Sequence, residues 1–416
     1  MLKLRSPAGA LVFALLSAVA SHAQAQTSME EPKTIDATRA TIRGSTRYIG
    51  LGGAFVAIAD DTQGVAINPA SAAVRLPYSW DAFSFSFGID ISVATWLPKN
   101  DLYNAPQSSG GSNGGSLFGS FAVLANYRHA GFGLAAEAEQ NVASNSSVQQ
   151  GFSTKLTANF GLVRPALAYG YFDGQLQLGA GLRVLGFSIG GSQGAVPLTA
   201  GIGYTAGVIV KPKGEQFRVG AAIEQPINAQ VAGEPGTAPT MVHIPWTAAF
   251  GFAYQFGKRQ LNPAFVTAKD RARRNKPRKK PTAGDEKKAE KALFDEYQED
   301  QTWYLLVSSE LALIQGRGTV ALGGAEALNR TLVSPRLGIE SEVVPRYLRL
   351  RAGTYLELAT TEEGHSRMHG TGGVDIKLFE WSVFGLVEPF DYWQLSLAAD
   401  GAKSYLNTSF SIGFWH

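Results

Sequence analysis

Residues 83–93 read FSFSFGIDISV, and this stretch decides the fold class. Phe, Ile and Val occupy its odd positions, whereas Ser, Gly and Asp occupy its even positions. A period of two residues is typical of a β-strand with one apolar and one polar face. The 11 residues, at about 3.3 Å each, are long enough to cross the hydrocarbon layer of a membrane at a tilt.

The same alternation recurs at residues 132–139, 152–162, 175–184, 217–224, 246–256, 348–358 and 406–414. In residues 152–162, Phe160 and Leu162 belong to the apolar face and Lys155 to the polar face. Strands with an apolar outer face and a polar inner face are the pattern of a transmembrane β-barrel with a wet lumen. Fourteen segments qualify, with starts near residues 82, 116, 132, 152, 175, 198, 216, 244, 302, 334, 348, 372, 382 and 404. The sequence therefore predicts an all-β fold, a 14-stranded antiparallel transmembrane β-barrel over residues 81–416.

The connections between these segments alternate in length. Short turns are expected at residues 128–131, 173–174, 211–215, 344–347 and 379–381. Longer loops are expected at residues 97–115, 143–150, 189–197, 227–243, 315–333 and 359–371. In outer-membrane barrels the short turns lie in the periplasm and the long loops outside. An even strand count then places both termini of the barrel in the periplasm.

Composition and the N-terminus indicate an exported protein. The chain has 416 residues, of which 17% are charged and none is Cys. The lack of Cys excludes disulfides, thiolate catalysis and Cys-ligated zinc. Lys3 and Arg5 precede an apolar stretch at 8–20 and the small residues of Ala23-Gln24-Ala25, which is the pattern of a secretory signal peptide over 1–25. We expect the mature protein to be an integral monomer in the outer membrane of a Gram-negative bacterium, in contact with lipopolysaccharide.

Two regions do not alternate. Residues 26–80 precede the first strand, and a 14-stranded barrel is wide enough to hold them as an N-terminal hatch in its lumen. Residues 257–301 form a charged insert, in which residues 258–300 contain 13 Lys+Arg and 8 Asp+Glu, hence a net charge of +5. Such charge blocks are usually solvated loops, although residues 283–298 have the spacing of a short amphipathic helix. We expect the insert to lie in the periplasm, with peptidoglycan, anionic lipid or a periplasmic partner as candidate ligands of 258–300.

The predicted hatch contains the sequence GLGGAFVAIADDTQGVAINPA at residues 50–70. Its paired glycines permit positive φ or close backbone packing, and its acidic pair and Asn-Pro are turn formers. A dinucleotide-binding fingerprint is excluded, because Phe55 stands where the third glycine is required and no βαβ unit surrounds it. The candidate hatch and gate residues are Gly52, Gly53, Ala54, Phe55, Asp60, Asp61, Asn68, Pro69 and Ala70.

This stretch resembles the N-terminal hatch of the long-chain fatty acid transporter (FadL/TodX-type) outer-membrane family. The resemblance covers residues 39–73 closely and the rest of the chain in architecture. It implies a 14-stranded barrel whose internal hatch gates the passive uptake of long-chain fatty acids or other hydrophobic compounds. A similar hatch also occurs in the shuttle barrels of type IX secretion, which bind protein. A secretion shuttle or assembly partner is therefore the alternative function, and a structural or non-specific porin is the third.

Charged residues on the inner face are candidate ligand contacts. By alternation the inward-facing residues are Lys155, Arg183, Arg218, Arg349, Arg351, Lys377, Asp90, Glu137, Glu139, Glu224, Glu310, Glu340, Glu357 and Asp375. A network that ties the strands and the hatch together is the ordinary role for such groups in a wet lumen. The alternative is that Arg183, Arg218, Arg349 or Arg351 binds the carboxylate of a fatty acid through two parallel hydrogen bonds.

Signals for catalysis, metals and nucleic acid are weak. The stretch 186–190 matches a G-x-S-x-G pattern but lacks the strand–turn–helix context of a hydrolase. His365 and His369 stand four residues apart in an expected loop, where a solvated loop is the ordinary interpretation and a metal site the alternative. We therefore predict no enzyme activity, no cofactor, no metal and no nucleic-acid partner.

Overall fold

A computed structural model gives the structure of the chain. It describes residues 34–37, 41–75, 81–94, 100–102, 104, 113–144, 155–191, 194–230, 241–275, 281–300, 302–316, 320–321, 327–361, 364–380 and 392–414. The predicted signal peptide 1–25 lies outside these residues.

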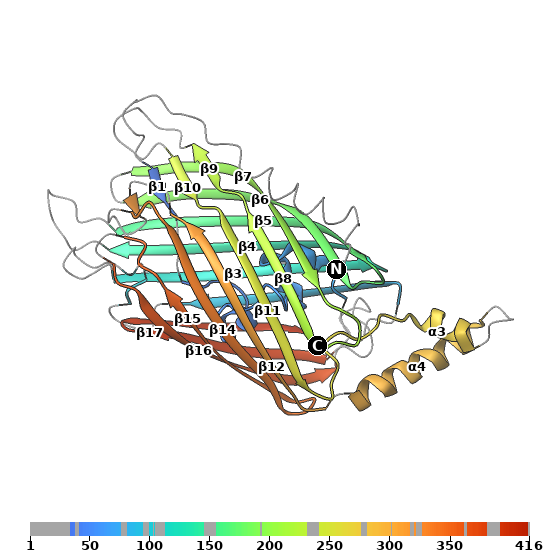
Figure 1. Cartoon of the computed structure of the whole chain (residues 1–416). Helices are drawn as coiled ribbons and strands as arrows, with labels where there is room; N and C mark the ends of the chain where they lie inside the picture. Colours follow the sequence, from blue (N-terminus) through green and yellow to red (C-terminus); the bar gives the residue numbers. More distant parts are fainter. Residues whose placement is uncertain are drawn as a thin grey trace, which may run out of the picture. The chain divides into compact units, whose positions relative to one another are not determined.

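The described residues contain fourteen antiparallel strands that close into a barrel (Figure 1). The strands are β2 (Phe83–Val93), β3 (Asn113–Tyr127), β4 (Ala130–Ser144), β5 (Lys155–Tyr171), β6 (Leu176–Gly191), β7 (Gly194–Val210), β8 (Phe217–Glu224), β11 (Thr247–Gly257), β12 (Tyr304–Gln315), β14 (Thr331–Val344), β15 (Leu348–Glu357), β16 (Arg367–Glu380), β17 (Tyr392–Ala402) and β18 (Tyr405–Phe414). Each strand pairs with its neighbour in this order, and β18 closes the ring on β2, with Phe410 opposite Ile91. The predicted fold class is confirmed.

Side chains alternate across the wall as the sequence pattern predicts. On β2, Phe83 and Phe85 are 56% and 44% exposed on the outside, whereas Ser86 and Asp90 are buried on the inside. Large apolar side chains are exposed on the outer face of successive strands around the ring. Among the described strands of the ring, closure leaves no unpaired edge to face lipid, which a membrane requires of a β-structure.

The two ends of the barrel differ in their connections. At one end, which we call the turn end, short segments join β3 to β4, β5 to β6, β7 to β8 and β14 to β15, at residues 128–129, 172–175, 211–216 and 345–347. At the opposite end, the loop end, longer segments join β8 to β11 and β12 to β14, although a two-residue turn at 403–404 joins β17 to β18 there. The N-terminal chain reaches β2 at the turn end, because Phe83 pairs with Tyr127 at the end of β3.

Several expected boundaries are wrong. We expected strands starting near 372 and 382. The first begins at Arg367, as β16, whereas residue 382 lies outside the described residues, which resume at Tyr392 in β17. The first was missed because Arg367 and His369 are buried while Met368 is exposed, so polar residues occupy the inner face. The expected loop 189–197 is mostly strand, since β6 and β7 reach Gly191 and Gly194.

The expectation of which face of β5 points to lipid is also wrong. Phe160 and Leu162 pack against the lumen cluster of Leu185 and Phe187 instead of facing lipid. The outward residues are those of odd number, such as Leu167 at 67% exposed. The side chain of Lys155 lies outside the described part of the structure.

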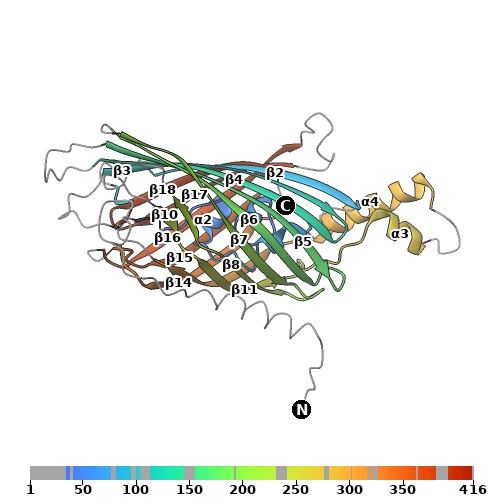
Figure 2. The ribbon, with the colours of Figure 1, turned by 90° about the horizontal axis from the view of Figure 1, so that it is seen from above.

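The N-terminal segment, residues 41–75, folds inside the ring of strands. It contains α2 (Thr46–Gly50) and two 3₁₀ helices, η1 (Thr62–Ala66) and η2 (Pro69–Ala73). Figure 2 shows α2 within the ring, where it contacts β15, β16, β17 and β18. The two 3₁₀ helices contact the opposite wall, from β2 to β7. Leu51, Phe55 and Ile58 form the apolar core of the segment.

A small sheet lies at the loop end. We expected residues 227–243 and 315–333 to form loops and residues 34–36 to belong to the hatch. The order of this sheet is β13 (Val320–Ala321), β1 (Thr34–Asp36), β10 (Met241–Ile244) and β9 (Ile227–Gln230). The strand β1 is parallel to both of its neighbours. Ile227 and Ala229 of β9 are fully buried against Leu185 and Phe187 of the barrel wall. This loop-end sheet therefore joins the N-terminal chain to two connections of the barrel.

The charged insert joins β11 to β12 at the turn end. It forms two helices, α3 (Ala268–Asn275) and α4 (Ala283–Asp300), which pack against each other (Figure 1). Helix α4 covers the stretch in which the spacing allowed a helix. Arg271 of α3 and Glu296 of α4 form an ion pair across the hairpin. Among the described residues, we find no helix with the length and apolar character needed to span a membrane.

Candidate functional site

The N-terminal segment meets the wall at glycines where a side chain has no room. Gly52 and Gly53 have φ of +61° and +76°, a conformation that favours glycine. A Cβ on Gly52 would lie 2.6 Å from the backbone N of Thr354 on β15. A Cβ on Gly53 would lie 2.9 Å from Cγ2 of Ile42. Both positions therefore require glycine for the segment to fold and to dock.

A buried carboxylate holds the next residues. One oxygen of Glu310, on β12, accepts the backbone N–H groups of Phe55 and Val56 at 2.9 and 2.8 Å. Its other oxygen lies 2.7 Å from Nη1 of Arg336 on β14. Ala54 and Phe55 are each only 1% exposed. Because hydrogen bonds to an ionised carboxylate are among the strong ones, Glu310 anchors this part of the segment to the wall.

The acidic pair splits into two environments. Asp60 lies between two guanidinium groups, with Oδ1 2.5 Å from Nη1 of Arg47 and Oδ2 2.7 Å from Nη1 of Arg218. Burial alone would raise the pKa of Asp60, but Arg47 and Arg218 hold it at about 2. Burial raises the pKa of Asp61 to about 7, and the charges of Asp60 and Asp90 add to this effect. Within the described part of the chain, the buried Oδ1 of Asp61 has no hydrogen-bond partner.

Arg47 continues the network into the wall. Its Nε lies 2.8 Å from Glu340 on β14, which is also 2.6 Å from Nε of Arg351 on β15. Arg351 forms two hydrogen bonds to Asp375 on β16, and Arg349 lies 3.4 Å from the same carboxylate. The predicted inward orientation of Arg349 and Arg351 is thus observed, and each is paired with carboxylates of the lumen.

Asn68, Pro69 and Ala70 form a compact turn against β7 and β8. The Nδ2 of Asn68 donates to the backbone oxygens of Val56 and Val208 at 3.0 and 3.2 Å. Its Oδ1 accepts the N–H of Ala70 at 3.0 Å and so caps η2, which begins at Pro69. Asn68 and Ala70 are completely buried. This turn therefore ties the segment to itself and to the wall.

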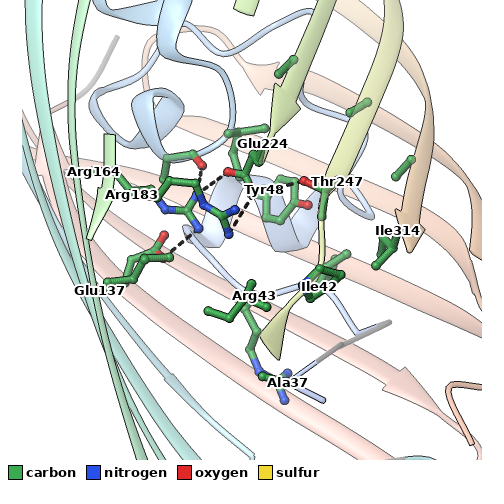
Figure 3. Close-up of a pocket in the computed structure, with 18 of the residues that line it drawn as sticks. Ala37, Ile42, Arg43, Tyr48, Glu137, Arg164, Arg183, Glu224, Thr247 and Ile314 are labelled. Atoms are coloured by element: carbon green, nitrogen blue, oxygen red, sulfur yellow. Dashed lines mark hydrogen bonds and ion pairs between the residues drawn. The ribbon is translucent and has the colours of Figure 1, made fainter. Parts of the chain in front are cut away.

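A cavity of about 270 Å³ lies in the lumen beside the N-terminal segment (Figure 3). Ile42, Tyr48 and Ile67 of the segment line it, as do Ile244 of β10 and Ala37, which directly follows β1. The wall contributes a further apolar set, Phe118, Phe160, Leu162, Leu185, Ala312 and Ile314. Three parts of the chain thus line the cavity, and one of them is the N-terminal segment itself.

The charged groups on the other side of the cavity pair with one another. Arg164 and Arg183 both contact Glu224, each at 3.1 Å, and Arg164 also lies 3.4 Å from Glu137, as Figure 3 shows. Thr247 donates a hydrogen bond to Glu224 at 3.1 Å. The lining contains four arginines (43, 164, 183 and 336) and four glutamates (137, 139, 224 and 310), so its formal charges cancel. Of the four predicted ligand-contacting arginines, Arg183 alone lines this cavity.

Sequence reasoning missed some of these residues. Arg164 was not expected to face the lumen, because the alternation of residues 152–162 was assigned to the wrong faces. The outward residues Leu167, Tyr169 and Tyr171 at the other end of β5 carried the right signal. Extending their odd parity back across Pro165 places Arg164, Leu162 and Phe160 inside.

We expected His369 to lie in a solvated loop, but the structure places it elsewhere. It is fully buried on β16, with Nδ1 2.7 Å from Asp400 and Nε2 2.6 Å from Glu357, and it stacks on Tyr355. His365 is separate, and its carbonyl oxygen accepts a hydrogen bond from Asn104. The described residues contain no group of three or more His, Asp or Glu side chains that could hold a metal ion. The G-x-S-x-G pattern at 186–190 lies within strand β6.

Comparisons with known proteins were made for the sequence and for the structure. No protein-family model matches the sequence, and no curated protein matches it. The structure is similar to that of a FadL homologue from Pseudomonas aeruginosa, at 12% identity over 90% of this chain and 97% of the other, with a TM-score of 0.52. It is also similar to the toluene transporter TbuX of Ralstonia pickettii, at 14% identity over 89% and 96% of the two chains, with a TM-score of 0.50. The structure is similar as well to the monoaromatic hydrocarbon channel CymD, at 13% identity over 90% of this chain and 97% of the other, with a TM-score of 0.52.

These similarities, together with the closed wall and its apolar outer face, identify the architecture. The chain has the fold of the FadL/TodX-type outer-membrane β-barrels.

Proposed function

We propose that this protein is an outer-membrane channel for the passive uptake of hydrophobic compounds, and that the N-terminal segment is its hatch. The observation that carries the proposal is the lumen cavity, which combines an apolar wall with charged groups that neutralise one another. The names of the similar barrels, a toluene transporter and a monoaromatic hydrocarbon channel, support a hydrophobic cargo. In this proposal the turn end faces the periplasm and the loop end faces outward.

The properties of the cavity favour a neutral cargo over a fatty acid. A dry apolar cavity of about 150 Å³ is enough to bind benzene, so 270 Å³ accommodates a substituted monoaromatic compound. A fatty-acid carboxylate would have to compete with Glu224 for Arg183, because these side chains already lie 3.1 Å apart. A neutral compound leaves this pair intact. Long-chain fatty acids therefore remain the second candidate cargo.

The hatch role follows from the position of the segment. Ile42, Tyr48 and Ile67 line the cavity, so a bound compound touches the N-terminal segment directly. A ligand shifts a conformational equilibrium only by binding one state better than the other. Contact with these side chains provides such a difference, because moving the segment changes the walls of the cavity.

Ligand binding to the purified protein tests the proposal. Mass spectrometry of protein in mild detergent would identify bound compounds, and titration with toluene and with oleate would measure both affinities. We expect Leu162→Ala to weaken toluene binding about tenfold, since it removes apolar contact area from the cavity wall. The control is Leu167→Ala on the same strand, which is 67% exposed on the outer face and should bind like the parent.

Two outcomes would contradict the proposal, and one would change only its cargo. Equal toluene affinities in the two variants would mean that the cavity is not the binding site. Oleate binding without toluene binding would favour the fatty-acid cargo. An empty barrel that copurifies with one stoichiometric protein would favour the alternative, a secretion shuttle or assembly partner.

A further inference from the structure

The start of the charged insert is packed into the turn end of the barrel. We call residues 258–267 the turn-end strap. Leu261 and Asn262 of the strap are only 6% and 1% exposed. Leu261 belongs to the same apolar cluster as Ile58 and Ala59 of the N-terminal segment. A solvated tether would bury neither residue, so this part of the insert is a structural component of the lumen.

Asn262 is held through its side-chain amide and its backbone oxygen. Its Nδ2 donates to the backbone oxygens of Glu215 and Phe217 at 2.9 and 2.8 Å. Its Oδ1 accepts from Nε of Arg218 at 2.8 Å, and its backbone oxygen accepts from the N–H of Gly214 at 3.1 Å. These contacts fix the strap to the turn between β7 and β8 and to the start of β8.

The far part of the strap reaches a different region of the wall. Phe265 lies under the guanidinium group of Arg75, 4.2 Å from ring centroid to Cζ, and contacts the ring of His129 edge to face. His129 lies in the turn between β3 and β4, and Arg75 ends the N-terminal segment. In the ring, β5, β6 and β7 separate β4 from β8. The strap therefore crosses the mouth of the barrel instead of following its rim.

Arg218 joins the strap to the N-terminal segment. Its guanidinium donates to the backbone oxygen of Leu261 at 2.7 Å and to Oδ1 of Asn262. It also donates to the backbone oxygen of Ile58 at 3.0 Å and to Asp60 at 2.7 Å. A single buried cation thus satisfies acceptors on both elements, and displacing either element leaves part of its hydrogen bonding unmade. Such losses are costly for a buried charge.

We propose that the turn-end strap is a second closure of the channel, coupled through Arg218 to the N-terminal segment so that the two open together. The inference rests on the proposed channel function. Compounds that leave through the turn end must pass the strap as well as the segment. The helical hairpin that follows begins at once, because Thr267 caps α3 through the N–H of Asp270 at 3.0 Å. Motion of the hairpin would therefore be transmitted to the strap.

The test measures access to the lumen, so its failure is distinct from a failure of the transport proposal. The chain has no Cys, and Thr62→Cys places a thiol on η1 at a position that is 5% exposed. The labelling rate of this thiol with a polar maleimide would be measured in the full-length protein. We expect Asn262→Ala to accelerate labelling at least about tenfold, because the strap loses its buried anchor. Arg271→Ala, which breaks only the ion pair between α3 and α4, is the control and should label at the parent rate.

Two further variants keep the test decisive. Phe265→Ala removes the contacts with Arg75 and His129 without altering the buried anchor, and it should also accelerate labelling if Asn262→Ala fails to fold. A Cys pair at Glu215 and Pro263 would tether the strap to the β7–β8 turn. In a planar bilayer bathed in KCl, we expect the channel to open less often with the pair oxidised than after reduction. Unchanged labelling in the folded variants, or equal conductance before and after reduction, would overturn the proposal.

Discussion

Asn68 of the N-terminal segment lies directly against the backbone of Gly207 on β7. A Cβ built on Gly207 would be 2.0 Å from Oδ1 of Asn68, well inside any real contact distance. The same oxygen caps η2 through the N–H of Ala70. The close approach therefore joins the turn of the segment to a wall strand, and it requires that the wall residue have no side chain.

Gly207→Ala should loosen the segment. The added methyl group must displace Asn68 or the strand, and overpacking of this kind costs about 1–3 kcal/mol. We expect a lower urea midpoint for the protein in detergent micelles. Gly370→Ala on β16 is the matched control, because no atom lies within 4 Å of its Cβ position. Equal midpoints in the two variants would show that the segment does not depend on this contact.

Asp60→Asn should destabilise the protein more than an ordinary ion-pair variant. Asp60 accepts from Arg47 and Arg218, which are both largely buried, so its removal leaves two cations short of a partner. Breaking a buried pair costs about 3–5 kcal/mol, and partial exposure of Asp60 lowers our expectation to about 2–3 kcal/mol. Asp173→Asn breaks an exposed pair with Lys213, and such pairs contribute at most about 1 kcal/mol. Urea unfolding of both variants measures the two losses in the free energy of unfolding. Similar losses would contradict the expectation that Asp60 belongs to a buried ion-pair network.

Much of the barrel could be predicted from the sequence because lipid imposes a simple rule on each strand. Alternation on β2, with Phe83 outside and Asp90 inside, is visible without a structure. The rule fails where the lumen itself is apolar, as at Phe160 and Leu162, since both faces of β5 then carry apolar residues. The cavity lies where the rule fails. For the same reason, alternation assigns these two wall residues to the lipid-facing side.

The contacts between distant parts of the chain were not predictable. Nothing in the alternation shows that Thr34–Asp36 pairs in parallel with residues 241–244 of a barrel connection. Likewise, Asn262 stands in a stretch whose charge suggests a solvated loop, yet it is buried against β8. Such contacts depend on which segments the closed ring brings to the same end, and a single sequence does not encode that proximity locally.

Asp61→Asn should stabilise the protein at high pH and leave it unchanged at low pH. The folded-state pKa of Asp61 is raised to about 7, above its unfolded value of about 3.9. Ionised Asp61 therefore opposes folding, and wild-type stability falls as the pH rises from about 4 through 7. Asparagine removes this penalty, so the variant should gain on the order of 1–3 kcal/mol at pH 9 and little at pH 4.

Urea midpoints at several pH values check this expectation, and Asp60→Asn is the internal contrast. Because the pKa of Asp60 is held at about 2, its loss should destabilise the protein at pH 5 and at pH 9 alike. A constant difference between Asp61→Asn and the parent across this range would mean that Asp61 does not titrate near neutral pH.

Arg183→Gln distinguishes a neutral cargo from an acidic one. Arg183 is 3% exposed, lines the cavity and pairs with Glu224, so the variant removes the cation that a ligand carboxylate would need. If the cargo is neutral, we expect toluene affinity within about twofold of the parent. A carboxylate bound by Arg183 would contribute about 1.5–3 kcal/mol, so its loss would weaken oleate binding roughly ten- to a hundredfold. Titration of both probes against this variant and against Arg128→Gln, an exposed turn residue, separates the two cases, because only a direct contact predicts a loss confined to oleate.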